Sequence, residues 1–214
     1  TPSAEWTPQD LDKLIAFDLD FNLMKDGDEP GVFRMTEQKG AGFAVTSEVK
    51  GTRGPKCLKG TDKKGLAKSF YPYMHVAPRA LKSGQITFTF AAQLPSQGAA
   101  PFTVELRGAT TQDTGPALVI ERDGAVKANG RPVCTLKPGQ WAAFEISFAL
   151  GDKRTGGYTL KTRNGNDEKT MTLPFGKDSF TEVGWLGITA PADADGCFYL
   201  DNLSLRIVDE AKSR

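Results

Sequence analysis

The sequence predicts an all-β protein, a two-sheet antiparallel jelly-roll β-sandwich, on three observations. Hydrophobic residues recur with a period close to two along most of the 214 residues. Gly, Pro, Asn and Asp separate these segments at short intervals, and no convincing amphipathic helix interrupts them. Roughly a dozen strands in one domain favour two sheets packed face to face, because a single open sheet would leave an apolar face in water.

The predicted strands near the amino end are short. Residues 15–21 alternate Ile, Phe, Leu and Phe with mostly polar residues, which describes a strand with one buried face. Strands over 43–50 and 56–59 flank a turn over 51–55, and 60–68 has the composition of a polar loop. An unusually aromatic segment follows, with the sequence Phe70-Tyr71-Pro72-Tyr73-Met74-His75-Val76.

The rest of the chain predicts a meander. Segments 86–90 and 102–106 alternate apolar with polar residues, as half-buried strands do. Asp123-Gly124 and Asn129-Gly130 are strong tight-turn signals between β segments. Further strands are expected at 144–148, 158–163, 170–173, 182–189 and 197–207.

Length and composition predict one domain. A chain of 214 residues with 39% hydrophobic content can bury one sizeable core. We place that domain at 15–208, after an N-terminal lead-in over 1–14 and before a C-terminal tail over 209–214.

Charge and hydropathy exclude several classes of partner. The 27 Lys and Arg nearly balance the 26 Asp and Glu, so no bulk field favours nucleic acid or an anionic membrane surface. No apolar run reaches the roughly 18 residues of a membrane span. We expect a soluble protein that is secreted or lies in the periplasm or at the cell surface, and we expect any export signal to have been removed.

The cysteines do not form a metal-binding pattern. Cys57, Cys134 and Cys197 lie far apart, and His75 is the only histidine, so zinc chemistry is not expected. Two arrangements stay open. In the first, Cys57 and Cys197 form a disulfide, because first and last strands often pair in sandwiches, and one free thiol is left. In the second, all three are buried free thiols.

Asp201 stands out in the closing strand. Tyr199, Leu203, Leu205 and Ile207 alternate along this strand, and Asp201 is expected on their face. Burying an unpaired carboxylate costs several kcal/mol. Asp201 must therefore be neutralised by a cation, by several hydrogen-bond donors, or by a local bulge that turns it outward.

Five motifs follow one another along the chain. They are Phe17-Asp18-Leu19-Asp20-Phe21, then Gly115-Pro116-Ala117-Leu118-Val119-Ile120 with Asp123-Gly124, then Gly139-Gln140-Trp141, then Val183-Gly184-Trp185-Leu186-Gly187-Ile188, then Phe198-Tyr199-Leu200-Asp201-Asn202-Leu203. In this order they resemble the concanavalin A-like lectin and glucanase sandwiches. Over about 15 to 208, the chain is most similar to bacterial secreted jelly-roll modules that accompany polysaccharide-degrading enzymes.

This resemblance implies a structural calcium ion. In such families the aspartate of the closing strand often helps to hold Ca²⁺, which here implies Asp201, with Asp20 or Asp18 as possible partners. Calcium takes six to eight oxygen ligands, so backbone carbonyls and water would complete the site. A hydrogen-bonded Asp201 is the alternative, and no organic cofactor is expected.

The resemblance also implies a sugar site on the outward face of the concave sheet. Tyr71, Tyr73 and His75 fall at alternate positions, so an extended strand would project them from one face. Glu105 and Arg107 share the polar side of their own strand. The alternatives are that the tyrosines pack beneath a neighbouring loop and that Glu105 and Arg107 form a solvated ion pair.

The two tryptophans at strand starts are expected elsewhere. Trp141 and Trp185 each precede or begin an apolar strand, where Trp side chains generally fill the space between sheets.

The catalytic motifs of similar enzymes are incomplete. The Glu-x-Asp-x-x-Glu strand of the glucanases does not occur. The Arg-x-Glu-x-Arg strand of alginate lyases is similar to Glu105-Leu106-Arg107, but Thr103 replaces the first arginine and no Gln-Ile-His segment follows. A lyase could still use His75 or Tyr73 as the base and Arg107 to neutralise a uronate carboxylate. The Gly-x-Ser-x-Gly elbow of serine hydrolases is also missing.

The sequence therefore predicts a non-catalytic module that binds a polysaccharide or oligosaccharide through Tyr71, Tyr73, His75, Glu105 and Arg107. A polysaccharide lyase or glycoside hydrolase of the same fold is the first alternative. A structural or protein-interaction module of the cell envelope is the second, because one sandwich scaffold hosts many unrelated tasks.

Overall fold

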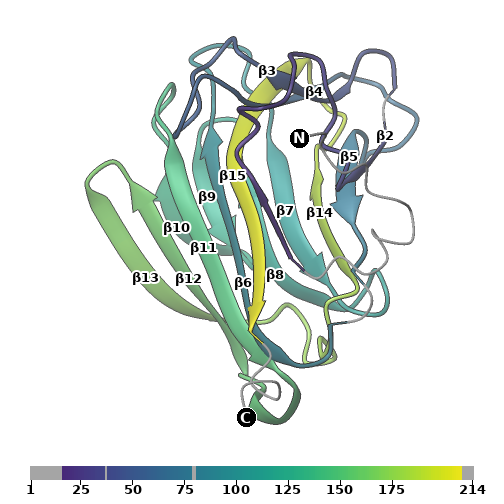
Figure 1. Cartoon of the computed structure of the whole chain (residues 1–214), viewed down its shortest axis with the longest axis vertical. Helices are drawn as coiled ribbons and strands as arrows, with labels where there is room; N and C mark the ends of the chain where they lie inside the picture. The colour runs from purple at the N-terminus through teal and green to yellow at the C-terminus, as the bar shows by residue number, and fades with distance from the viewer. Residues whose placement is uncertain (1–15, 37, 79–80, 209–214) are drawn as a thin grey trace.

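Two antiparallel β-sheets stacked face to face make up the protein in a computed structural model that describes residues 16–36, 38–78 and 81–208 (Figure 1). Sheet A has the strand order β13-β12-β11-β6-β15-β4-β3, with β1 also paired to β15, and sheet B has the order β10-β9-β8-β7-β14-β5-β2. The predicted all-β, two-sheet sandwich is confirmed. The side of each sheet that faces away from the other sheet is called its outer face below.

Sheet A contains eight strands and sheet B contains seven. Sheet A consists of β1 (Phe17–Leu19), β3 (Gly42–Thr46), β4 (Cys57–Asp62), β6 (Gly84–Gln93), β11 (Ala142–Leu150), β12 (Gly157–Asn164), β13 (Asp167–Pro174) and β15 (Gly196–Val208). Sheet B consists of β2 (Arg34–Thr36), β5 (Tyr73–Val76), β7 (Phe102–Arg107), β8 (Thr114–Ile120), β9 (Ala125–Ala128), β10 (Arg131–Thr135) and β14 (Trp185–Thr189). One 3₁₀ turn, Gly151–Lys153, follows β11. No helix in the described ranges is long and apolar enough to span a membrane.

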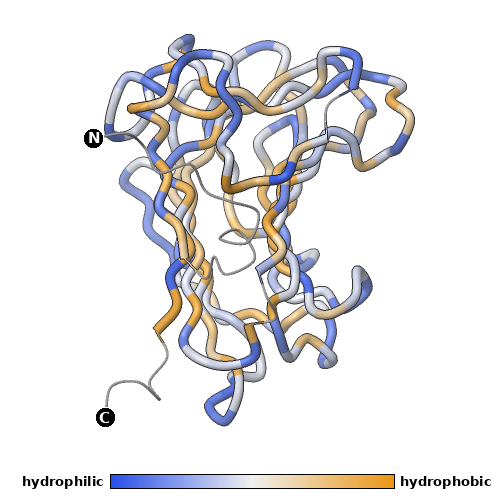
Figure 2. The backbone as a smooth tube through the Cα atoms, turned by 45° about the vertical axis from the view of Figure 1, so that its right-hand side comes forward, coloured by the Kyte–Doolittle hydropathy of each residue, from blue (hydrophilic) through white to orange (hydrophobic). Residues whose placement is uncertain are grey.

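The core lies between the two sheets. Strand β7 shows how its residues are divided, because Phe102, Val104 and Leu106 are buried in the core and alternate with half-buried polar residues. Phe102 stacks on Phe198 of β15 with ring centroids 4.1 Å apart, so a direct aromatic contact joins the sheets. Figure 2 shows the two layers from the side, with hydrophobic residues recurring along both.

Strand β15 contains a bulge that changes which of its residues face the core. Its register against β6 shifts between Asp201 and Ser204, and Asn202 in the shift has a φ of 50°. Leu200 faces the core before the bulge and Leu203 faces it after the bulge. The expectation that Asp201 shares the face of the later leucines is therefore wrong, because the bulge places it on the outer face, where it is nevertheless fully buried.

The cysteines are all free thiols. Cys197 on β15 lies opposite Thr61 of β4, four residues from Cys57. Four residues of strand span about 13 Å, and cysteines whose Cα atoms are more than about 7 Å apart cannot be bridged without moving the backbone. The predicted Cys57–Cys197 disulfide is wrong. Burial raises the pKa of the Cys57 thiol to about 12, with a further contribution from the Asp201 carboxylate.

Element boundaries differ from the prediction mainly at the amino end. Strand β4 continues to Asp62, into the segment expected to be a loop, and the Phe198 ring packs directly over its Gly60. The turns at Asp123-Gly124 and Asn129-Gly130 connect β8 to β9 and β9 to β10 as predicted. The predicted lead-in over 1–14 and tail over 209–214 lie outside the described residues.

Candidate functional site

The five residues that the sequence proposes for sugar binding lie on one side of the molecule, on or beside the outer face of sheet B. Tyr73 and His75 are on β5, where Met74 is fully buried on the opposite side of the strand. Glu105 and Arg107 are on β7, two strands away, and Tyr71 comes two residues before β5. The period of two in each strand is what exposes these residues together.

Trp185 lies between the proposed sugar-binding residues of β5 and those of β7. It begins β14, which lies between β5 and β7. Its indole covers Gly187, since a Cβ at that glycine would lie 2.1 Å from the ring. The His75 ring lies nearly parallel to the indole, at 16° with centroids 5.9 Å apart, and the Arg107 guanidinium lies 4.6 Å from the indole centroid.

The placement of both strand-start tryptophans in the core is wrong. Trp185 is half-buried on the outer face of sheet B. Trp141 is also half-buried, and its Nε1–H donates to the Lys50 carbonyl oxygen at 2.9 Å. Strand parity would have found the position of Trp185, because it alternates with the core residues Leu186 and Ile188.

Aromatic rings continue from His75 toward the start of β5. His75 and Tyr73 have ring centroids 5.4 Å apart, and Tyr73 and Tyr71 have centroids 5.8 Å apart. Phe70, which is 51% exposed, closes the sequence of rings at 5.2 Å from Tyr71. We call these five residues, Trp185, His75, Tyr73, Tyr71 and Phe70, the aromatic row. The prediction that the tyrosines project with His75 agrees with this arrangement.

An ion pair borders the aromatic row on the β7 side. The Arg107 guanidinium donates through Nε to the Glu105 carboxylate at 2.9 Å and through a second, shorter contact from its terminal nitrogen. Both side chains are mostly buried, at 26% and 18% exposed. The ion pair that the sequence left open as an alternative is therefore present, and it fixes Arg107 beside the indole.

His75 is set up to be neutral. Burial lowers the pKa of its imidazole, and the nearby positive charge of Arg34 on β2 lowers it further. Its Nδ1 atom is buried and has no hydrogen-bond partner among the described residues. At neutral pH the ring can thus act as an uncharged donor and acceptor, which suits hydroxyl groups better than it suits carboxylates.

The predicted calcium ligands belong to the other side of the molecule, where Asp201 lies on β15 of sheet A and Asp20 directly follows β1 of the same sheet. Asp201 Oδ2 accepts hydrogen bonds from the Thr52 backbone N–H at 2.6 Å and the Thr52 hydroxyl at 2.8 Å, and its Oδ1 accepts one from the Asn202 N–H at 2.8 Å. Asp20 Oδ1 accepts the Asn22 N–H at 3.2 Å. These are the hydrogen bonds that the sequence offered as the alternative to a cation.

Asp201 and Asp20 lie near each other without belonging to a larger cluster of metal-binding side chains among the described residues. The described part of the chain contains no group of three or more His, Cys, Asp or Glu suited to a metal ion. Asp20 lies close enough to raise the pKa of Asp201, although burial raises it more. Calcium at this position stays a prediction, and the donors from the Thr52 backbone and hydroxyl already satisfy Asp201.

Comparison with known proteins identifies the fold. The sequence matches no family profile and no curated protein. The structure is similar to a double mutant of the alginate lyase Aly36B in complex with alginate tetrasaccharide (TM-score 0.59, 10% identity, 92% of this chain and 98% of that chain). It is also similar to a PL-14 alginate lyase from Aplysia kurodai (0.53, 11%, 78% and 87%) and to the catalytic domain of a GH131 β-glucanase from Podospora anserina (0.57, 10%, 95% and 89%). The chain thus has the concanavalin A-like jelly-roll fold.

Proposed function

We propose that the protein binds a polysaccharide or oligosaccharide on the outer face of sheet B, without catalysis of its own. The observation that carries this proposal is the aromatic row, which joins Trp185 to the predicted residues Tyr71, Tyr73 and His75. Pyranose rings have apolar C–H faces that pack on aromatic rings, and their hydroxyls find partners in the Tyr hydroxyls and the imidazole. Glu105 and Arg107 add a fixed polar border.

The similar structures support a polysaccharide as the ligand. Two of them are alginate lyases, one of them holding an alginate tetrasaccharide, and another is a β-glucanase. A polymer of this kind is met outside the cytoplasm, so we also propose that the protein is secreted or lies at the cell surface or in the periplasm.

A polysaccharide lyase is the second candidate, and one feature favours it. A neutral His75 beside Tyr73 has the protonation state of a general base, and Arg107 lies on the same face. A lyase also needs a positive charge for the uronate carboxylate, but Arg107 is already paired with Glu105. Binding without a reaction needs no free cation, so the geometry supports binding better than it supports a lyase.

The test is affinity electrophoresis through gels that contain neutral, uronic-acid or sulfated polysaccharides. We expect the protein to be retarded by at least one polymer and Tyr73→Ala to weaken that affinity by about tenfold, since losing a central ring costs more than about 1 kcal/mol. Tyr73→Phe is the matched control, because it keeps the ring and should stay within about threefold of the original protein.

Each mixture is also assayed for new reducing ends and for unsaturated products. If products form and are lost in His75→Ala, the protein is a lyase and the proposal of binding without catalysis is wrong. Equal affinity of the protein and Tyr73→Ala would remove the ligand from this face. Failure to bind any polymer would favour a structural module of the cell envelope.

A further inference from the structure

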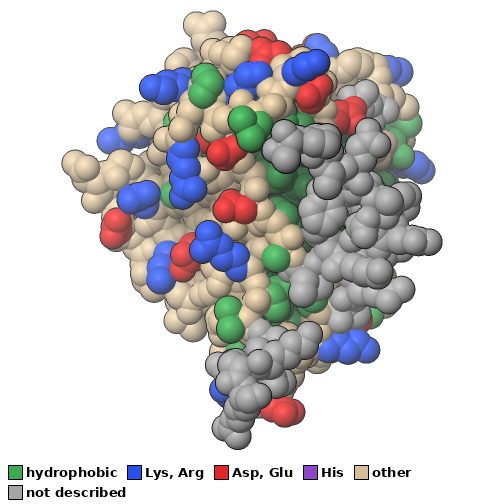
Figure 3. All heavy atoms as spheres, viewed as in Figure 1, with side chains coloured by type: hydrophobic (Ala, Val, Ile, Leu, Met, Phe, Trp, Pro, Cys, Tyr) green, Lys and Arg blue, Asp and Glu red, His purple; other side chains and the backbone are tan. Residues whose placement is uncertain are grey.

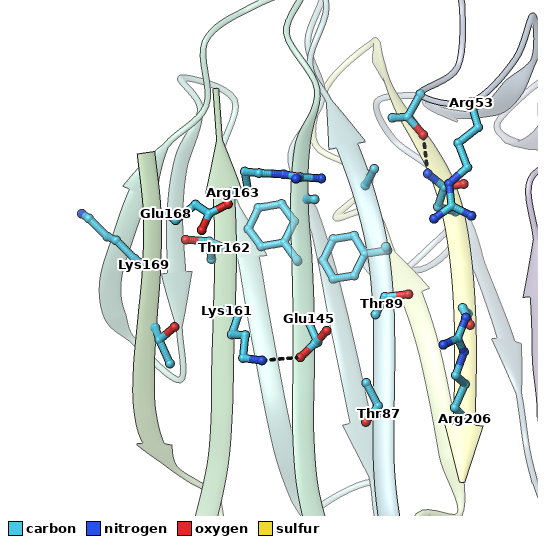
Figure 4. Close-up of a pocket in the computed structure, with 18 residues that line it drawn as sticks. Arg53, Thr87, Thr89, Glu145, Lys161, Thr162, Arg163, Glu168, Lys169 and Arg206 are labelled. Atoms are coloured by element: carbon cyan, nitrogen blue, oxygen red, sulfur yellow. Dashed lines mark hydrogen bonds and ion pairs between the residues drawn. The ribbon is translucent and has the colours of Figure 1, made fainter. Parts of the chain in front are cut away.

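A groove lies over the outer face of sheet A, on the other side of the core from the aromatic row. It has a volume of about 580 Å³ and crosses β13, β12, β11, β6 and β15, with the loop before β4 at one end (Figure 4). Figure 3 views the molecule from this side and shows Lys and Arg side chains interspersed with Asp and Glu. No residue of the aromatic row lines it.

The groove has a floor of short side chains between walls of long ones. Thr89 and Ala91 on β6 pair with Glu145 and Ala143 on β11, so three of the four central positions carry only one to three heavy side-chain atoms. The walls stand on β12 and β15, which are three strand spacings apart, or about 14 Å. An extended polymer fits this width, whereas a compact small molecule would leave most of it unfilled.

The lining is markedly more basic than the whole chain. Five basic and two acidic residues line the groove, and the complete sequence has a net charge of only +1. The basic residues are Arg53, Lys161, Arg163, Lys169 and Arg206, and the acidic ones are Glu145 and Glu168. A hollow lined mainly by one sign of charge concentrates ligands of the opposite sign.

Two of these five basic residues have no ion-pair or hydrogen-bond partner in the described part of the chain. Lys161 pairs with Glu145 at 3.1 Å, Arg206 lies 3.9 Å from Asp18, and Lys169 points away from the groove, donating to a backbone carbonyl. Arg53 and Arg163 have no ion-pair or hydrogen-bond partner within the described ranges, and both are exposed. In Figure 4, Arg163 extends over β11 and Arg53 stands at the β15 side, so they face the floor from both walls.

The end of the groove that carries Arg53 is rigidly held. The buried Asp201 accepts both the backbone N–H and the hydroxyl of Thr52, the residue before Arg53. Gly51 makes this close approach possible, because a Cβ there would lie 2.8 Å from the Asp201 carboxylate. The buried aspartate that the sequence singled out thus positions a cation.

Polar atoms at the same end lack partners. Ser204 is 4% exposed and lines the groove, and its Oγ is buried with no hydrogen-bond partner among the described residues. Asn202 Oδ1, also at the groove, is in the same condition. Buried polar groups are nearly always paired in native proteins, so these two oxygens would gain a partner if their side chains turned toward a polar ligand in the groove.

We propose that this groove is a second binding site, separate from the proposed sugar face, for an acidic polysaccharide whose carboxylate or sulfate groups pair with Arg53 and Arg163. The short hydroxyl side chains of the floor meet the hydroxyls of the sugar, and the Ser204 and Asn202 side chains would reach them by turning toward the groove. Nucleic acid is disfavoured because the two phenylalanines at the groove, Phe90 and Phe144, are buried and cannot stack on bases, and because Glu145 and Glu168 repel closely spaced phosphates. An anionic membrane is disfavoured because its flat surface does not enter a groove.

The experiment measures binding of alginate, dextran sulfate, neutral dextran and duplex DNA by affinity electrophoresis at low ionic strength. It uses Tyr73→Ala as the parent, so that the sheet B face is already weakened. We expect Arg53→Ala/Arg163→Ala to lower the affinity for at least one acidic polysaccharide by about tenfold or more, with neutral dextran unchanged. Alginate and dextran sulfate distinguish a carboxylate ligand from a sulfate ligand.

Two matched variants control for charge and folding. Lys82→Ala/Arg122→Ala removes the same charge from exposed residues outside both faces and should keep affinity within about twofold. Arg53→Lys/Arg163→Lys keeps the charge and should retain most of the affinity for the acidic polysaccharide. Three results would each overturn the inference. The Lys82 and Arg122 control could lose as much affinity as the Arg53 and Arg163 variant, the protein could bind DNA as tightly as the acidic polysaccharide or more tightly, or the parent could bind no acidic polysaccharide. The sheet B proposal is tested separately, by comparing the original protein with Tyr73→Ala.

Discussion

Among single residues, Asp62 has the most unusual environment. It ends β4 with no exposed surface, its Oδ1 accepts the Lys63 N–H at 2.7 Å, and its Oδ2 is buried without a partner among the described residues. Burial raises its pKa to about 6, and the nearby carboxylates of Asp193 and Asp195 add to the rise. Because the pKa is higher in the folded state than in the unfolded chain, the folded state prefers the protonated form. This preference stabilises the protein below about pH 4 and is lost as the pH rises to about 6.

Asp62→Asn tests this assignment. The amide oxygen keeps the Lys63 hydrogen bond and removes the ionisation, so we expect the variant to be more stable than the original by about 1–3 kcal/mol at pH 7 and nearly equal at pH 4. Urea unfolding at both pH values measures the two free energies. Parallel pH profiles for the two proteins would mean that another group is responsible.

At the scale of elements, strand parity explains both what the sequence predicted and what it missed. The regular β5 and β7 let Tyr73, His75, Glu105 and Arg107 be placed on outer surfaces from alternation alone, although their meeting on one sheet depends on β14 inserting between them. The register shift in β15 broke the same argument for Asp201, because a bulge leaves no reliable mark in the sequence.

The groove was missed for a different reason. Arg53, Arg163 and Arg206 come from three separate segments that have no common motif, and only the sheet order brings them to one surface. Pairing between strands far apart in sequence is a property of the fold that local patterns do not contain. The aromatic segment at 70–76, by contrast, is local, and alternation alone predicted that Tyr71, Tyr73 and His75 lie together, as their ring contacts show.

Gly187 is the position on β14 where the aromatic row depends on a missing side chain. A Cβ there would lie 2.1 Å from the Trp185 indole, which must then move away from the sheet and from His75. We expect Gly187→Ala to lower the free energy of unfolding by about 1–3 kcal/mol and to weaken glycan affinity as Tyr73→Ala does. Gly156→Ala is the control, since a Cβ at Gly156 meets nothing within 4 Å. Unchanged affinity in Gly187→Ala would show that the indole position is not needed.

For the whole molecule, the decisive question is whether both outer faces rest on one cooperative core. Phe198 on β15 stacks on Phe102 of β7, meets Phe43 of β3 at 6.0 Å, and covers Gly60 of β4, so its ring joins both sheets.

We expect Phe198→Ala to lower the free energy of unfolding by about 3–5 kcal/mol, because Gly60 has no side chain that could fill the cavity. Phe198→Leu keeps most of the volume and should cost less than half as much. Denaturant unfolding followed by both tryptophan fluorescence and circular dichroism should give coincident single transitions for both variants, because the core residues of the two sheets in the described ranges form one cluster. Two separated transitions would mean that the sheets carry independent units, and the two proposed sites would then have to be studied as parts of different domains.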